Sequence, residues 1–337
     1  IPWYGTPYAP VAEPAFREEL EPSQCRLPRL LREAGYVTGM AGKWHLTTNP
    51  RQGFYTHLNQ QAADEFGFDQ VAAPGPGSQN EGDKWVNYMT DYAVDFVTQH
   101  RGQPWFFYLS HHTLHGKVTA PAELIAKHRE RGAPEIGLGN ATYLAAIQHL
   151  DASIGRLMDA LEATDQLENT LVIFLADNGG VDTQYHHQQT DGSPYDTSQP
   201  LAVKSQQLEN APLREGKGSM YEGGIRIPCI VRWPAEIAAD QVSSIPIHVV
   251  DWLPTLLAAA ELESSGVEDG LSLLPIFRGE TDSQAASAFN KRSLYWYMPL
   301  YDLRWAATPC AVVRQGDWKL IEFFGDWFDD KQGYHTG

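Results

Sequence analysis

Three clusters of polar residues follow apolar runs of strand length, and their residue types could do chemistry together. Lys43 and His45 follow the first run, and His115 lies in the histidine-rich segment after the second. Asp177 and Asn178 follow the third run. In an open parallel sheet, ligands bind outside the carboxyl ends of the strands. We therefore expect the three clusters to meet at one site.

The residue types suit a tetrahedral anion held beside a metal ion. Asp177 and Asn178 offer the oxygen ligands that Ca²⁺ and Mg²⁺ prefer. Lys43 and His45 are two residues apart, so on an extended chain they face the same side and supply cations or donors. Phosphoryl and sulfuryl transfer depend mainly on such charge stabilisation and positioning. The clusters therefore favour one of these two reactions.

A glycine-rich segment at residues 213–228, LREGKGSMYEGGIRIP, adds a second lysine. Its glycines let the backbone approach a ligand closely while Lys217 points toward the site. Lys217 and His115 would then add a cation and a donor around the anion.

Each cluster also has an ordinary structural interpretation when taken alone. Asp-Asn-Gly-Gly is a common turn after a strand, Lys43 could be a solvated cation, and a glycine-rich segment can be a flexible loop. At least two of His111, His112 and His115 are expected to be loop or packing residues. His111 and His115 could also form a zinc pair at helical spacing, but no HExxH pattern accompanies them. The joint occurrence of the clusters favours the functional interpretation.

Helices that alternate with short apolar strands predict an α/β fold, with a mostly parallel central sheet flanked by helices. Strands are expected at residues 36–42, 105–109, 171–176 (a buried parallel strand) and 227–233. Helices are expected at residues 27–34 with Gly35 as the stop, 89–97, 144–161, and 251–260 with Pro254 in the first turn. Residues 1–24 and 73–78 are expected to be irregular, and residues 181–210 to be an ordered excursion near a site or a mobile loop.

The character of the sequence changes after about Arg292, where aromatic residues become frequent. Aromatic-rich strands at residues 294–297 and 317–323 predict a small antiparallel unit. We expect residues 1–290 to form the catalytic α/β domain and residues 291–337 to begin a C-terminal antiparallel subdomain.

The amino-acid composition limits the kinds of partner and site that the protein could have. The net charge of −17, without any run of Lys and Arg, argues against a nucleic-acid partner. No apolar run approaches the roughly 20 residues needed to span a bilayer. Cys25, Cys229 and Cys310 show no zinc-site spacing, and any disulfide would leave one of them over.

Several segments of the sequence resemble those of a known protein family. Residues 35–46 (GYVTGMAGKWHL), 174–180 (FLADNGG) and 213–228 are similar to three signature blocks of the type I sulfatases, in their order. Residues 105–115, 251–257 and 314–323 resemble further segments of these arylsulfatase-like proteins, so the resemblance covers nearly the whole chain. It implies the alkaline-phosphatase-like fold and hydrolysis of sulfate esters on a sulfated small molecule or glycan.

The resemblance also implies roles for the matched positions. Asp177 and Asn178 would bind a divalent cation, Ca²⁺ in most of the family and Mg²⁺ as the other possibility. Lys43 and Lys217 would neutralise sulfate oxygens. The resemblance places His45 beside the nucleophile, where it would help to break down the covalent sulfate intermediate. His115 would contact the leaving-group oxygen as a candidate general acid.

One part of the family pattern is absent from the 337 residues. Family members begin with a strand bearing paired aspartates, followed by a C-x-P-S-R or S-x-P-S-R segment whose Cys or Ser becomes a formylglycine nucleophile. Cys25-Arg-Leu-Pro-Arg29 has its proline one place late and no serine, so Cys25 is not expected to be the nucleophile. The chain is therefore expected to be an internal fragment that is inactive by itself and binds its metal weakly.

Two alternatives stay open at this stage. The same scaffold could hydrolyse phosphomonoesters, phosphodiesters or phosphonates. A non-catalytic pseudoenzyme that binds a sulfated glycan is the other alternative, although the joint presence of the six site residues argues against it. The family further implies an extracytoplasmic location, which is periplasmic, secreted or lysosomal.

Overall fold

The computed structural model of the chain describes residues 19–47, 58–72, 82–115, 118–181, 183–186, 201–204, 209–263, 266, 268–280, 284–299, 308–324, 327–329 and 333–335. The loop expected at residues 73–78 lies outside these ranges, as do most of the irregular arm at 1–24 and much of the polar stretch at 181–210.

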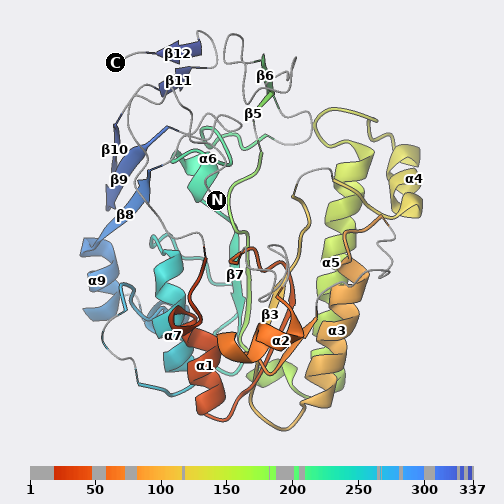
Figure 1. Cartoon of the computed structure of the whole chain (residues 1–337), viewed down its shortest axis with the longest axis vertical. Coiled ribbons are helices and arrows are strands. Elements are labelled where there is room, and N and C mark those ends of the chain that lie inside the picture. Colours follow the sequence, from red (N-terminus) through yellow and green to blue (C-terminus); the bar gives the residue numbers. More distant parts are fainter. Residues whose placement is uncertain are drawn as a thin grey trace.

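A three-stranded parallel sheet lies at the centre of the molecule, in the order β2-β1-β3 (Figure 1). Its strands are β1 (Val37–Gly42), β2 (Gln70–Ala72) and β3 (Trp105–Ser110). β1 pairs in parallel with both neighbours, and Gly42 lies beside Ser110. The strands predicted at residues 36–42 and 105–109 are confirmed, and because they are parallel they end at the same edge of the sheet.

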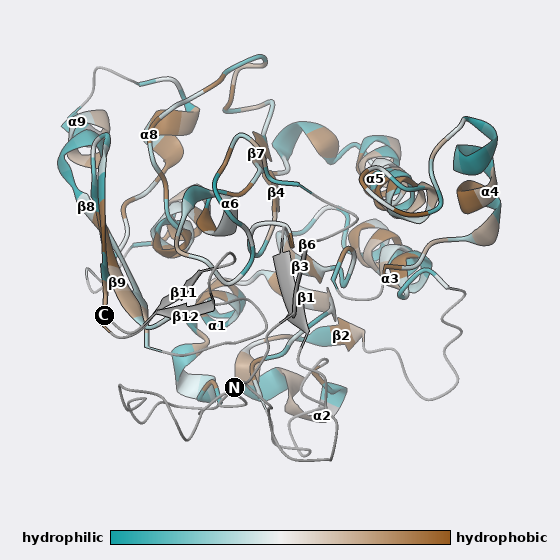
Figure 2. Ribbon diagram, turned by 90° about the horizontal axis from the view of Figure 1, so that it is seen from above, coloured by the Kyte–Doolittle hydropathy of each residue, from teal (hydrophilic) through white to brown (hydrophobic). Residues whose placement is uncertain are grey.

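Helices cover both faces of this sheet, as Figure 2 shows. On one side lie α3 (Val86–Gln99), α4 (Ala122–Glu130) and α5 (Ala141–Ala163), and on the other lies α1 (Arg26–Glu33), which contacts α7 (Trp252–Ala259). A side chain at Gly39 of β1 would lie 2.6 Å from Phe96 of α3, so this glycine lets the helix pack directly on the strand. Among the described residues, no helix is both long and apolar enough to cross a membrane.

The predicted strand at residues 171–176 is present, but its direction and burial differ from the prediction. β4 (Val172–Leu175) pairs antiparallel with β7 (Cys229–Arg232), where a strand was also expected. Phe174 and Leu175 are each 37% exposed. An apolar run indicates that a segment suits a strand, whereas its direction depends on a partner more than fifty residues away. The prediction of a buried parallel strand was therefore wrong in both respects.

The remaining elements are short or belong to a second sheet. The short helices are η1 (Pro22–Gln24), α2 (Gln60–Ala63), η2 (Asp64–Phe66), η3 (Leu167–Asn169), α6 (Glu222–Ile225), η4 (Val249–Asp251), α8 (Leu274–Phe277) and α9 (Gln284–Lys291). The antiparallel pairs are β5 (Thr183–His186) with β6 (Leu201–Lys204), and β11 (Trp327–Asp329) with β12 (Gly333–His335). The strands β8 (Ser293–Met298), β9 (Cys310–Gln315) and β10 (Trp318–Phe323) form an antiparallel sheet, which confirms the predicted C-terminal unit.

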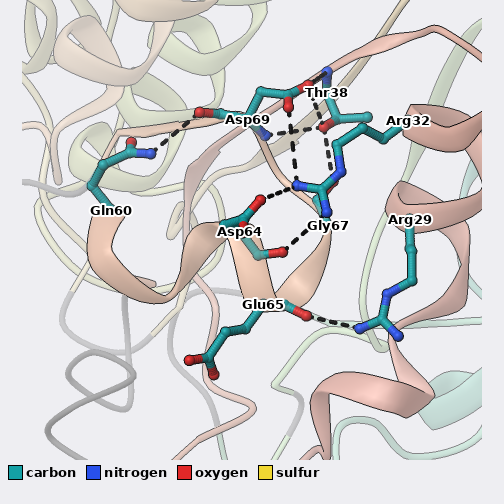
Figure 3. Close-up of polar contacts among 8 residues, drawn as sticks. All are labelled: Arg29, Arg32, Thr38, Gln60, Asp64, Glu65, Gly67 and Asp69. Carbon is teal, nitrogen blue, oxygen red and sulfur yellow. Dashed lines mark hydrogen bonds and ion pairs between the residues drawn. The ribbon is translucent and has the colours of Figure 1, made fainter.

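The turn between η2 and β2 is held to the start of β1 by polar contacts (Figure 3). The buried hydroxyl of Thr38 donates to the Gly67 carbonyl over 2.8 Å, and the Thr38 amide donates to Asp69 over 2.8 Å. Arg32 of α1 forms an ion pair with Asp64, the first residue of η2. These bonds satisfy the buried polar groups beside β1 and fix α1 and β2 relative to it.

An ion pair with a fully buried carboxylate joins η4, just before α7, to the residue that precedes β8. Asp251 is fully buried and accepts two hydrogen bonds from Arg292, at 2.5 and 2.6 Å. It also accepts from the backbone N–H groups of His248 and Leu271, at 2.7 and 3.0 Å. One carboxylate therefore holds together η4, the segment before α8, and the residue between α9 and β8.

A second buried network lies behind the segment that follows β3. Nε2 of His111 is 3.4 Å from the Ser153 hydroxyl of α5, which is 2.6 Å from the Thr90 hydroxyl of α3. Burial and the neighbouring His149 lower the pKa of His111 to about 4, and the nearby Asp83 opposes this shift. The geometry makes His111 a packing residue, as expected for at least two of the three histidines in this segment.

We predict that the Asp251→Ala variant loses about 3–5 kcal/mol in its free energy of unfolding, because it leaves the mostly buried Arg292 guanidinium without its carboxylate partner. The exposed ion pair between Glu236 and Arg278, at 2.7 Å, provides a matched control. Glu236→Ala is expected to cost at most about 1 kcal/mol. Urea denaturation of both variants measures the difference, and equal losses would contradict the structural role of Asp251.

We also predict that His111 makes stability fall with acidification. The folded-state pKa of His111, about 4, lies below the ordinary 6.5. The contribution of His111 to the free energy of unfolding is therefore constant above about pH 6.5 and declines as the pH falls toward 4. The full decline is about 3 kcal/mol. Urea denaturation of the wild type and of His111→Gln between pH 7.5 and 4.5 measures it. The stability difference between the two proteins should shrink at low pH, and a pH-independent difference would refute the prediction.

Candidate active site

β1 ends in a turn that carries Lys43 across the end of β3. Gly42 has a φ of 106°, and a Cβ there would lie 2.0 Å from the Ser110 carbonyl oxygen. The amide of Lys43 donates to that same oxygen over 2.8 Å. The next residue, Trp44, is only 6% exposed and packs edge-on against Phe66 at 4.9 Å between ring centroids. The buried indole thus anchors the segment that presents Lys43.

His45 does not lie on an extended chain with Lys43, which corrects the sequence-based expectation. β1 stops at Gly42, and His45 has a φ of 52°, so the chain turns at this residue. Partial burial, followed by the charges of Lys43 and Lys217, lowers the pKa of His45. The two lysines come from segments far apart in the sequence, so the fold brings all three residues into one electrostatic environment.

The turn after β4 brings Asp177 to the end of β1. Asp177 Oδ2 is 4.0 Å from Lys43 Nζ, and the Asp177 side chain is 73% exposed. The side-chain nitrogen Nδ2 of Asn178 donates to the Gly179 carbonyl over 2.9 Å. The first and third polar clusters of the sequence therefore meet.

Lys217 is placed by direct contact between two backbones. The amide of Gly179 donates to the Gly224 carbonyl, and the amide of Lys217 donates to the Gly180 carbonyl, both over 2.9 Å. A Cβ on Gly179 would lie 1.7 Å from the Gly223 carbonyl oxygen. The glycines are thus required for the turn after β4 to rest on the glycine-rich segment.

The same glycine-rich segment is joined to the antiparallel sheet by an acidic side chain. Glu222 accepts a hydrogen bond from Lys319 of β10 over 2.9 Å and lies 3.6 Å from Arg314 of β9. Burial opposes ionisation of Glu222, but Lys319 and Arg314 outweigh it and lower the pKa of the carboxyl. The C-terminal sheet therefore supports the segment that carries Lys217.

His115 lies on the exposed side of the segment that follows β3. Its amide donates to the His112 carbonyl over 2.8 Å. Partial burial and then the charges of Lys217, Lys43 and Lys84 lower the pKa of His115 to about 4, against the opposing charge of Asp177. Around neutral pH its imidazole is therefore neutral in the structure as described.

Lys84 is a residue of this site that sequence reasoning did not identify. Its ammonium donates a hydrogen bond to the backbone carbonyl of His115. Burial and then the charge of Lys43 lower the pKa of Lys84. The sequence carries no signal for this role, because a lysine just before a helix is usually a solvated surface residue.

Asp177 and Asn178 suit a hard divalent cation but form only part of a site. Because Asn178 Nδ2 donates to Gly179, Oδ1 is the atom that could bind the ion. Within the described ranges, no three His, Cys, Asp or Glu side chains gather closely enough to hold a metal ion. Six to eight oxygen ligands are usual for Ca²⁺, so these two residues could supply a minority of them.

Cys25 packs against a hydrophobic cluster that includes Met40 and Phe66. Burial raises the pKa of its thiol to about 11, although Arg29 opposes the shift. A thiol with so high a pKa is a poor nucleophile, which supports its interpretation as a structural residue.

Comparison with known proteins gives consistent matches. The Sulfatase family model matches residues 4–262, and the model described as N-sulphoglucosamine sulphohydrolase, C-terminal, matches residues 216–332. Among curated relatives, a sulfatase of Formosa agariphila is 30% identical over 263 residues, covering 74% of this chain and 42% of that protein. Arylsulfatase A of Homo sapiens is 30% identical over 353 residues, covering 94% of this chain and 62% of that protein.

The solved structures agree on the fold. The structure of Ps i-CgsB in complex with k-i-k-neocarrahexaose matches with a TM-score of 0.65 and 21% identity, over 100% of this chain and 70% of that chain. The chain thus spans about two-fifths to three-fifths of the two curated relatives described above. With the first family model matching well over half of the residues, the chain belongs to the sulfatase family.

Proposed function

We propose that the complete protein hydrolyses sulfate esters and that this chain supplies the anion-binding part of its active site. The observation that carries the proposal is the convergence of Lys43, Lys217, His45, His115 and Asp177 from four separate segments. The basic residues among them gather in a chain whose net charge is −17, so they form a local site for an anion rather than part of a basic surface.

Each basic residue has a role in this proposal. Lys43 and Lys217 neutralise oxygens of the bound sulfate, where charge stabilisation contributes most to the rate. His45 lies beside the nucleophile and assists breakdown of the covalent intermediate. His115 donates a hydrogen bond or a proton to the leaving oxygen. Because a bound anion favours the charged form of a neighbouring imidazole, substrate binding would raise the pKa of His115 above its value of about 4.

A divalent cation, Ca²⁺ or alternatively Mg²⁺, is part of the same proposal. Asp177 would bind it through a carboxylate oxygen and Asn178 through Oδ1, with further ligands from outside the described residues. When bound, the ion would neutralise negative charge on the sulfate oxygens. Lys43, 4.0 Å from Asp177, would then help to orient that carboxylate.

The nucleophile and the substrate complete the proposal. The nucleophile is a formylglycine formed from a Cys or Ser outside the described residues, since Cys25 is partly buried against the hydrophobic cluster. The substrate is a sulfated small molecule or glycan, which the carbohydrate complex of the structural relative supports. An extracytoplasmic location is proposed as well.

We predict that Lys217→Ala lowers kcat/KM of the full-length protein for an aryl sulfate by about 10²–10³-fold, because it removes one of the groups that neutralise the anion. Lys291→Ala, at an exposed position on α9, is the matched control and should leave the rate unchanged. The same assay includes phosphate and phosphonate esters. Faster turnover of those esters than of sulfate esters would reject the proposal in favour of a phosphoryl or phosphonyl hydrolase.

We also predict that Ca²⁺ raises the melting temperature of the full-length protein and that Asp177→Ala abolishes most of this shift. A ligand that binds only the native state stabilises it, so the shift reports binding without any need for turnover. Asp240→Ala, at another exposed aspartate, serves as the control. An unchanged calcium shift in Asp177→Ala would remove Asp177 from the metal site.

A further inference from the structure

The turn that precedes α3 reaches the candidate active site through one side chain. The ammonium of Lys84 donates to the carbonyl of His115, across 31 residues of sequence. Lys84 also lies close enough to Lys43 for the two charges to repel each other. A lysine without a specific role would turn its ammonium toward solvent, away from another cation.

The backbone of this turn has a conformation that residues with a Cβ seldom adopt. Lys84 and Trp85 are consecutive and have φ values of 55° and 60°. Such left-handed residues persist where the surrounding structure fixes them, and they are frequent at functional sites. Two in succession indicate that the direction of the Lys84 side chain is imposed by the fold.

Asp83 fixes this conformation from inside the protein. Its carboxylate is 2% exposed and accepts hydrogen bonds from the amides of Trp85 and Asn87, over 2.9 and 3.0 Å. Nε2 of His149, on α5, lies 3.2 Å from the same carboxylate. The turn is thus connected to a helix that packs against α3.

We propose that Lys84 is a positioning residue for His115. Its hydrogen bond to the His115 backbone would hold the imidazole at the leaving oxygen, and the contact between Asp83 and His149 would hold Lys84. The inference rests on the proposed sulfate-ester hydrolysis for its catalytic consequence, but the contact itself does not depend on it. The charged groups that face His115 are Lys43, Lys84 and Lys217, with Asp177 opposing them.

The first test follows the imidazole of His115 directly. Histidine-labelled full-length protein is titrated by NMR, with His115→Gln used to assign the signal. Lys84→Met removes both the hydrogen bond and a positive neighbour, so we expect the titration midpoint of His115 to rise. Lys84→Arg keeps a cation and a donor and should stay near the wild type, and Lys291→Met is the matched surface control. An unchanged midpoint in Lys84→Met would overturn the proposal.

The second test measures turnover of a sulfate ester by the same variants. Small misplacements of a catalytic group cost up to about a hundredfold in rate, so Lys84→Met should lose about ten- to hundredfold in kcat with KM little changed. Lys84→Arg should recover most of the loss. A rise in KM alone would show that Lys84 binds substrate instead of positioning His115, and would overturn the proposal.

The two tests separate this inference from the proposed function. If the wild type hydrolyses no sulfate ester, the proposed function fails, whereas the NMR titration still decides whether Lys84 acts on His115. If the wild type hydrolyses a sulfate ester and the Lys84→Met protein matches it in both tests, the positioning role of Lys84 is rejected and the proposed function stands.

Discussion

The site depends on a place where two stretches of backbone touch without side chains between them. Gly179 rests on the carbonyl of Gly223, at a distance that no Cβ could tolerate, and hydrogen bonds on either side hold the two segments in register. One segment carries Asp177 and Asn178, and the other carries Lys217. The spacing between the carboxylate and the second lysine is therefore set by peptide groups, which are much less mobile than long side chains.

Three lysines from separate segments gather around the site. Lys43, Lys84 and Lys217 lie near two histidines, and Asp177 is the acidic group that acts on His115 among the described residues. Like charges held together raise the free energy of the folded protein unless an anion binds among them. Burial and then these lysine charges lower the pKa of both histidines. The rest of the molecule carries a large negative charge, so this positive region is local and specific.

Much of the fold was predictable from the sequence, because periodicity and glycine positions are local signals. β1, β3 and the helix α5 lie where the apolar patterns place them, and Gly35 has the left-handed φ of 91° expected of a helix stop. The direction of β4 was not predictable, since it depends on β7, which lies more than fifty residues further along. The chain also turns at His45, which residue spacing alone could not reveal.

The candidate site shows the same division between local and distant information. Lys43 and Asp177 were identified because each follows an apolar run, and the structure brings them to 4.0 Å. Lys84 follows no strand, and its relevance arises only when the turn before α3 folds over the segment that carries His115. A residue whose role depends on tertiary contact alone leaves no pattern in one sequence.

The bond between Glu222 and Lys319 has a consequence for how the protein folds and unfolds. It attaches the C-terminal antiparallel sheet to the segment that carries Lys217. Loss of the sheet would remove this support even with every residue before position 290 intact, and it would leave the segment held by its backbone contacts with the turn after β4. Residues beyond position 290 therefore contribute to the stability of a site whose own residues all precede that position.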